Sequence, residues 1–128
     1  GTLQIDAQSL ALAAAGARAW LLREARQTLE TVVRARGAEM GVRPKRLFLR
    51  EQRSRWGSCS TKGNLSLNWR LIQAPHGVLD YVVVHELAHL REFNHSKQFW
   101  ALVAAHCPDY KRWVLWLKQE GWKLRGDL

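Results

Sequence analysis

Two histidines and a glutamate at residues 85–89 form the strongest chemical pattern in the sequence. His85 and His89 are four residues apart, so on a helix they lie about one turn apart and both imidazoles point from the same face. That geometry suits a single metal ion. Glu86 sits beside this face, where it is placed to take a proton from a metal-bound water rather than to bind the metal. The pattern predicts a metal-dependent hydrolase.

A third histidine, His95, follows six residues after His89. On an unbroken helix six residues turn the chain by about 600°, which points His95 away from the other two. The helix must therefore stop first. Asn94 tolerates the left-handed conformation that ends helices, and Ser96 is a good N-cap for a new helix. We therefore expect His85, His89 and His95 to bind Zn²⁺, with a fourth position open for water.

Three neutral imidazoles leave zinc with its full positive charge, which lowers the pKa of a bound water towards ~7. Glu86 then acts as the general base and passes the proton to the leaving amine. A structural zinc usually has four protein ligands, and the remaining histidines, His76 and His106, are far away in the sequence. Candidates for stabilising the oxyanion are Tyr81, Tyr110 and His106. The alternative without a metal is a group of core histidines hydrogen-bonded to backbone groups.

Apolar spacing predicts the elements that lead up to the site. Residues 7–40 show helical periodicity and form one long helix or two, ending before Gly41. Residues 45–54 and 63–69 are predicted to be two antiparallel strands, joined by a loop near residues 56–62.

The site helix is predicted over about 76–92, with Pro75 in its first turn. Apolar residues occur nearly all round it, which is typical of a buried helix. Unpaired charge is unfavourable there, and a metal would give the histidines and the glutamate a partner. Further helices are predicted over 96–106 and 110–119. Together these elements predict a single α+β domain over residues 1–128, with a long N-terminal helix, a small antiparallel sheet, the histidine helix and C-terminal helices.

The strand that precedes the site helix has a second predicted role. Proteases often hold a peptide as an added strand on an exposed sheet edge. This strand could provide that edge, with Asn64, Ser66 and Asn68 as the candidate substrate contacts. The alternative is ordinary packing within the sheet.

The 128-residue chain carries a net charge of +9, with 20 Lys and Arg against 11 Asp and Glu. This charge favours an anionic partner, with nucleic acid first, although a basic surface also occurs in proteins that are merely soluble. Arg53 and Arg55 beside Trp56 combine cations with a ring that can stack on bases, so they are the candidate nucleic-acid contact. The alternative is that Trp56 is buried beneath its loop.

Cys59 and Cys107 are the only cysteines, and their separation does not suit a cysteine zinc site. No apolar run approaches the ~20 residues that a membrane span needs. The first residues lack the layout of a signal peptide. We therefore expect a reduced, cytoplasmic protein that acts as a monomer and does not associate with a membrane.

Five segments resemble one known family. The segments similar to motifs of the YgjP-like, SprT-related zinc metallopeptidases are residues 55–59 (Arg-Trp-Gly-Ser-Cys), 67–68 (Leu-Asn), 80–90, 94–100 (Asn-His-Ser-Lys-Gln-Phe-Trp) and 107–110 (Cys-Pro-Asp-Tyr). The resemblance spans about residues 15–120 and is far more specific than His-Glu-x-x-His alone. It therefore links the metal pattern to peptide hydrolysis.

The resemblance implies a minimal zincin-like fold. It places His85, His89 and His95 at the family's metal positions and Glu86 at its catalytic position, and all four residues are present. Such proteins commonly carry a β-rich segment ahead of the first helix, and we expect none within these 128 residues. The resemblance thus implies a zinc peptidase acting on peptide or protein substrates.

Other functions stay open at this point. The net charge of +9 also suits a nucleic-acid-binding module whose zinc is structural. The related SprT and Spartan proteins imply DNA-linked proteolysis, so a DNA-stimulated protease would combine both activities. A third alternative is a hydrolase acting on a non-peptide amide, because zinc-hydroxide chemistry does not define its substrate.

Overall fold

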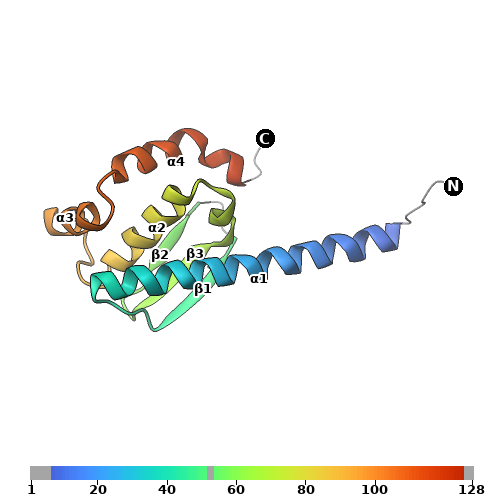
Figure 1. Ribbon diagram of the computed structural model, residues 1–128, viewed down its shortest axis with the longest axis horizontal. Helices are drawn as coiled ribbons and strands as arrows, with labels where there is room; N and C mark the ends of the chain where they lie inside the picture. Colours follow the sequence, from blue (N-terminus) through green and yellow to red (C-terminus); the bar gives the residue numbers. More distant parts are fainter. Residues whose placement is uncertain (1–6, 52–53, 126–128) are drawn as a thin grey trace.

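A computed structural model describes residues 7–51 and 54–125 (Figure 1). The elements in chain order are α1 (Ala7–Met40), β1 (Arg46–Arg50), β2 (Gly57–Cys59), β3 (Asn64–Asn68), the 3₁₀ helix η1 (Trp69–Gln73), α2 (His76–Ala88), α3 (Lys97–His106) and α4 (Tyr110–Arg125). The expected α+β fold is confirmed, with its long N-terminal helix, small sheet, histidine helix and C-terminal helices.

The N-terminal helix is one continuous element over the predicted range, and its two halves differ. The C-terminal half buries a stripe of apolar side chains, including Ala25, Leu29 and Val33, and it packs on α2 and η1. Residues 7–20 are all exposed and extend away from the body of the molecule (Figure 1). Gly41 ends the helix at φ +69°, a left-handed conformation that glycine adopts without a Cβ penalty.

The sheet differs from the predicted antiparallel pair. Its strand order is β1-β3-β2, and β1 runs parallel to β3, with Leu47 opposite Leu65. The antiparallel neighbour of β3 is β2, which lies inside the predicted loop and places Gly57 opposite Leu67. The sequence Gly-Ser-Cys of β2 has neither an apolar run nor apolar alternation, so the prediction missed this strand and paired the apolar run of β1 with the alternating β3. The first strand also ends at Arg50 rather than at residue 54.

The helix α2 lies at the centre of the fold, between the sheet and α4 (Figure 1). It contacts α1, α3, α4, η1, β2 and β3, and its apolar residues are buried nearly all round, as predicted. On its outer side Asp80 forms a two-point ion pair with Arg36 of α1, in which the Nε–Oδ1 distance is 2.7 Å. Leu65 and Leu67 of β3 complete the core beneath it. This burial fixes the direction in which the last turn of α2 presents its side chains.

The C-terminal helix α4 packs through two glycines. An ideal Cβ on Gly77 of α2 would lie 2.1 Å from the Trp113 ring, and one on Gly121 would lie 3.1 Å from the Trp56 ring. Bare backbone at these positions therefore gives both indoles their space. α4 continues through Gly121 to Arg125, beyond the predicted end at residue 119. None of the helices in the described part of the chain is long and apolar enough to cross a membrane.

The helix α2 ends earlier than predicted, and the segment between α2 and α3 is correspondingly longer. The helix ends at Ala88, with His89 as its C-cap, rather than near residue 92. Asn94 does not adopt a left-handed conformation, because no non-glycine residue that the structure describes has a positive φ. Ser96 does cap the next helix, as predicted, and its Oγ accepts a hydrogen bond from the Phe99 N–H at 3.3 Å. The break redirects the chain so that residue 95 returns towards the end of α2.

Candidate metal centre

The three predicted histidines converge. His85 lies in the last turn of α2, His89 caps that helix, and His95 lies just before α3. One ring nitrogen from each lies within 4.8 Å of the other two, and the Nε2 atoms of His85 and His95 are 3.4 Å apart. In a tetrahedral zinc site with bonds of about 2.0–2.1 Å, ligand nitrogens lie ~3.3 Å apart. The three imidazoles therefore fit one shared ion.

The protonation of these imidazoles suits metal binding. Burial, followed by the charges of His89 and His95, lowers the pKa of His85 to about 4. Burial and then His95 also lower the pKa of His89. The Tyr81 hydroxyl lies 3.1 Å from Nδ1 of His85, and Nδ1 of His89 lies 3.3 Å from the Glu92 carbonyl oxygen. These contacts occupy Nδ1 and leave Nε2 of both rings free to bind a metal.

Two aromatic side chains of α3 hold the histidines from behind. The ring of Phe99 is fully buried, and its centroid lies 5.0, 4.4 and 4.9 Å from those of His85, His89 and His95. The ring of Trp100 lies 5.7 Å from His85 and stacks on His95 at 6.0 Å. This apolar wall restricts the imidazoles and keeps water from their back side. From the sequence, these two residues could be linked to the site only through the family resemblance, whose motif over residues 94–100 contains both.

Glu86 faces the same site and is only 7% exposed. Burial raises the pKa of its carboxyl to about 7, against the opposing effect of the nearby Arg55 charge. Its neighbour on the sheet is Gly57 of β2, where an ideal Cβ would lie 2.9 Å from Cγ and 3.2 Å from Oε2 of Glu86. The carboxylate therefore occupies space that any side chain at position 57 would take. The pattern of residues 55–59 contains no direct signal of this contact.

These groups border one hollow of about 350 Å³. Its walls are Arg55, Gly57, Ser58, Cys59, His85, Glu86, His89, Phe93 and His95. One side is β2, an edge strand of the sheet, and the other is the end of α2 with the following loop. The hollow thus combines a metal-binding set, a carboxylate with a raised pKa and a strand edge, which is the arrangement expected of a metal-dependent peptidase.

Comparison with known proteins agrees with this geometry. A family model described as YgjP-like, metallopeptidase domain, matches residues 4–120. The chain belongs to the YgjP-like metallopeptidase family. The chain is therefore a metallopeptidase, an enzyme whose substrates are peptides, and its three clustered histidines could hold the metal ion.

Two solved structures share the fold of this YgjP-like domain. The metallopeptidase zymogen of Pyrococcus abyssi abylysin is 20% identical with a TM-score of 0.59, and the match covers 72% of this chain and 95% of that one. The metallopeptidase zymogen of Methanocaldococcus jannaschii jannalysin is 18% identical with a TM-score of 0.57, and the match covers 68% and 93%. Among curated proteins, no sequence matches the chain.

The prediction that β3 forms the substrate-binding edge of the YgjP-like domain is wrong. Asn64, Ser66 and Asn68 lie on β3, which is the central strand and is paired on both sides. Asn68 is also buried, and its side chain accepts a hydrogen bond from the Arg70 N–H at 3.0 Å to cap η1. The prediction assumed that the strand nearest to the helix in sequence would form the edge, but β2 lies outside it in the sheet.

The predicted nucleic-acid contact is divided by the fold. Arg55 lies at the rim of the histidine hollow, whereas Trp56 is half-buried and packs on Gly121 of α4. Arg53 lies outside the described residues. For Arg55 and Trp56, the residues of this group that the structure describes, the indole is therefore packed against α4 rather than presented beside the guanidinium as a stacking ring.

The other candidate ligands and oxyanion groups have structural partners. Tyr110 stacks on Trp100 at 5.3 Å, and His106 lies 3.7 Å from the Glu39 carboxylate. Neither His106 nor His76 belongs to the metal-binding group found among the described residues. Both cysteines are free thiols, and Cys59 borders the hollow.

Proposed function

We propose that the domain is a zinc-dependent peptidase in which Glu86 is the general base and acid. The observation that carries this proposal is the convergence of three imidazoles and one buried carboxylate on a single hollow. His85, His89 and His95 would hold the ion through one nitrogen each. Zinc bound there would supply a Lewis acid and lower the pKa of water.

The environment of Glu86 suits transfer of a proton. With a pKa of about 7, the carboxylate can accept a proton from water at one Oε atom and return it to the leaving amine near neutral pH. Its burial beside Gly57 restricts its rotamers, so the Oε atoms stay directed towards the hollow. Arg55 at the rim contributes positive charge close to the carboxylate.

The edge strand β2 supports a peptide as the substrate. Within residues 7–51 and 54–125, β2 pairs with β3 on one side only, and Gly57, Ser58 and Cys59 border the hollow. An extended peptide that added to β2 would form main-chain hydrogen bonds there and pass directly beside the histidines. This arrangement favours a polypeptide over a small non-peptide amide, since a small amide would not use the strand edge.

Metal analysis and peptide cleavage test the proposal together. Zinc-reconstituted protein should hold about one Zn²⁺ per chain and cleave members of a peptide library. Glu86→Gln should keep the zinc and lose cleavage by about 10²- to 10⁴-fold, whereas His85→Ala should lose both. His76→Ala is the matched control, because His76 is exposed and lies outside the hollow.

Two results would refute the proposal. One is reconstituted protein without zinc, and the other is a Glu86→Gln variant that cleaves at the wild-type rate. Adding single-stranded DNA to the same assay tests the DNA-stimulated alternative. This alternative is supported by the net charge of +9. It gains no support from Trp56 as a stacking ring, because Trp56 packs against α4.

A further inference from the structure

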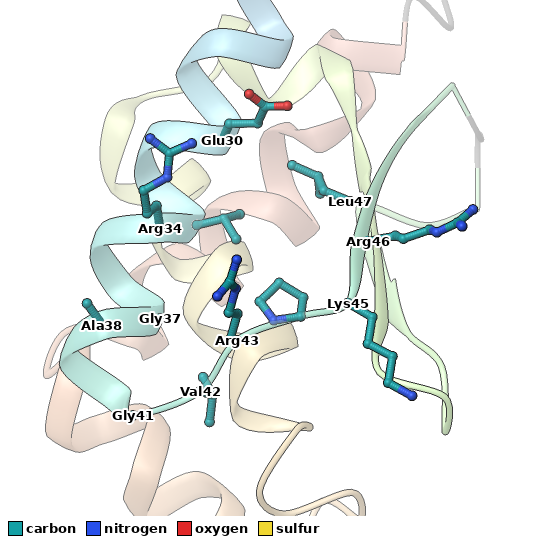
Figure 2. Close-up of a pocket in the computed structure, with 12 residues that line it drawn as sticks. Glu30, Arg34, Gly37, Ala38, Gly41, Val42, Arg43, Lys45, Arg46 and Leu47 are labelled. Carbon is teal, nitrogen blue, oxygen red and sulfur yellow. The ribbon is translucent and has the colours of Figure 1, made fainter.

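A second, larger hollow lies beside β1, the edge strand on the other side of the sheet from the histidine site. It is a groove of about 630 Å³ between the last turns of α1 and the strand β1 (Figure 2). Because the strand order is β1-β3-β2, this groove borders the edge opposite to the one beside the histidines. The two hollows share no lining residue. The groove is therefore a separate feature that the peptidase site leaves unexplained.

The strand that borders this groove has an open side. Among the described residues, β1 pairs with β3 alone. The Leu47 carbonyl oxygen accepts a hydrogen bond from Nη1 of Arg26 at 3.2 Å, so a side chain rather than a strand satisfies it. Edge strands of this kind offer main-chain donors and acceptors to an added extended segment.

The floor of the groove is apolar. Val33 of α1, Val42 and Pro44 of the connecting loop, and Leu47 of β1 line it, and Figure 2 shows Leu47 directed from β1 towards α1. At the closed end the chain turns back tightly, because an ideal Cβ on Gly37 would lie 2.7 Å from the Val42 carbonyl oxygen. Alternate side chains of a strand added to β1 would face this floor.

The walls carry uncompensated positive charge. Arg34, Arg43, Lys45 and Arg46 line the groove, and none of them forms an ion pair within the described part of the chain. Figure 2 shows the Arg43 side chain extending into the space between α1 and β1, and Arg34 lying along α1. The single acid in the lining, Glu30, is already paired with Arg26 at 3.1 Å. A bound partner would therefore have to supply negative charge.

We propose that this groove binds an extended acidic segment of a protein, which adds to β1 as a further strand. Its apolar side chains would lie on the floor formed by Val33, Val42 and Leu47, and its carboxylates would pair with Arg34 and Arg43. None of the described residues that line the groove is aromatic, so they do not provide the stacking platform that single-stranded nucleic acids use. The binding needs neither the metal nor Glu86, and it is independent of the proposed catalytic function.

A designed peptide tests the two parts of this proposal. The probe is a fluorescein-labelled peptide of about ten residues in which Glu and Val alternate, and binding is followed by fluorescence polarisation. It should bind about tenfold more tightly than the peptide in which Lys replaces Glu. Methylating alternate main-chain amides on the side facing β1 should weaken binding by a similar factor, because those amides would pair with the strand. Equal affinities in either comparison overturn the proposal.

Charge reversal locates the binding site. Arg34→Glu combined with Arg43→Glu should weaken binding of the Glu/Val peptide at least tenfold. Lys111→Glu combined with Lys118→Glu changes the net charge equally on α4 and should leave most of the affinity. All four residues are exposed, and circular dichroism would verify the fold of each variant. If both double variants bind alike, the groove is not the site.

Two further arms separate this site from its alternatives. Glu86→Gln should bind the peptide as tightly as the wild type, even if the catalytic proposal fails. An oligothymidine that displaces the peptide at a lower concentration than unlabelled peptide would overturn the proposal in favour of a nucleic-acid site.

Discussion

Adding one methyl group to Gly57 should reduce catalysis while leaving the metal in place. The ideal Cβ of Gly57→Ala lies 2.9 Å from Cγ and 3.2 Å from Oε2 of Glu86, and 3.2 Å from Cδ2 of Leu67, whereas ordinary contacts begin near 3.4 Å. The Glu86 side chain must therefore move by about half an ångström, the difference between 2.9 and 3.4 Å. The three atoms nearest to this methyl group belong to Glu86 and Leu67, and none of them belongs to His85, His89 or His95.

The size of the effect follows from this displacement. A misplacement of about 1 Å can reduce an enzymatic rate by ~10²-fold, so half of that displacement corresponds to about a tenfold loss in kcat/KM. The overpacked contact with Leu67 should also lower the free energy of unfolding by about 1–3 kcal/mol. The zinc content should stay at the wild-type value, since no ligand is changed.

The assay compares peptide cleavage, zinc content and thermal unfolding for the wild type and Gly57→Ala. Gly16→Ala is the matched control, because a Cβ at Gly16 has nothing within 4 Å and alanine favours the helix by about 0.5–1 kcal/mol. A Gly57→Ala enzyme with normal zinc content and a normal kcat/KM would show that this contact does not position Glu86.

Three further predictions test other contacts. Tyr81→Phe removes the hydroxyl that lies 3.1 Å from Nδ1 of His85, and chelator competition should show zinc affinity about 10- to 100-fold lower, with Tyr110→Phe nearly unchanged. Gly77→Ala should lower the melting temperature through a loss of about 1–3 kcal/mol, because its Cβ would lie 2.1 Å from Trp113; an unchanged melt would contradict the packing. Arg18, and then Arg70, lower the pKa of Glu51 from 4.5 to about 2. The stabilisation from Glu51 is therefore present above about pH 4.5 and is lost as the pH falls through about 2, so Glu51→Gln should be less stable than the wild type at pH 7 but equal to it below pH 2.

The clustering of the three histidines was predictable because the geometry of His85 and His89 is local. The spacing of His85 and His89 determines their shared helical face whatever the rest of the fold does. The return of His95 was also correctly expected, but for a partly wrong reason, since the break comes at His89 and Asn94 is not left-handed. The cap at Ser96 was a local signal and is confirmed.

The sheet was not predictable in the same way, because strand pairing depends on residues that are distant in sequence. The apolar run of β1 and the alternation of β3 lie close in sequence, which favours a hairpin, yet the two strands are parallel neighbours. The three residues of β2 contain no leucine, valine or isoleucine to mark them as a strand. As a result, the sequence could not show that Gly57 lies against Glu86, and it assigned the substrate edge to the wrong strand.

The central position of β3 has a consequence for how the domain folds. The consecutive strands β1 and β2 are not neighbours in the sheet, and each of them pairs with β3. A nascent chain that ends before Asn64 therefore contains two strands with no partner, and the sheet gains both of its pairings when residues 64–68 insert between them. Parallel pairing also requires closure of a longer loop than a hairpin does, which slows folding. Formation of the sheet, and with it the placement of Gly57 beside Glu86, should thus occur as one cooperative step rather than strand by strand.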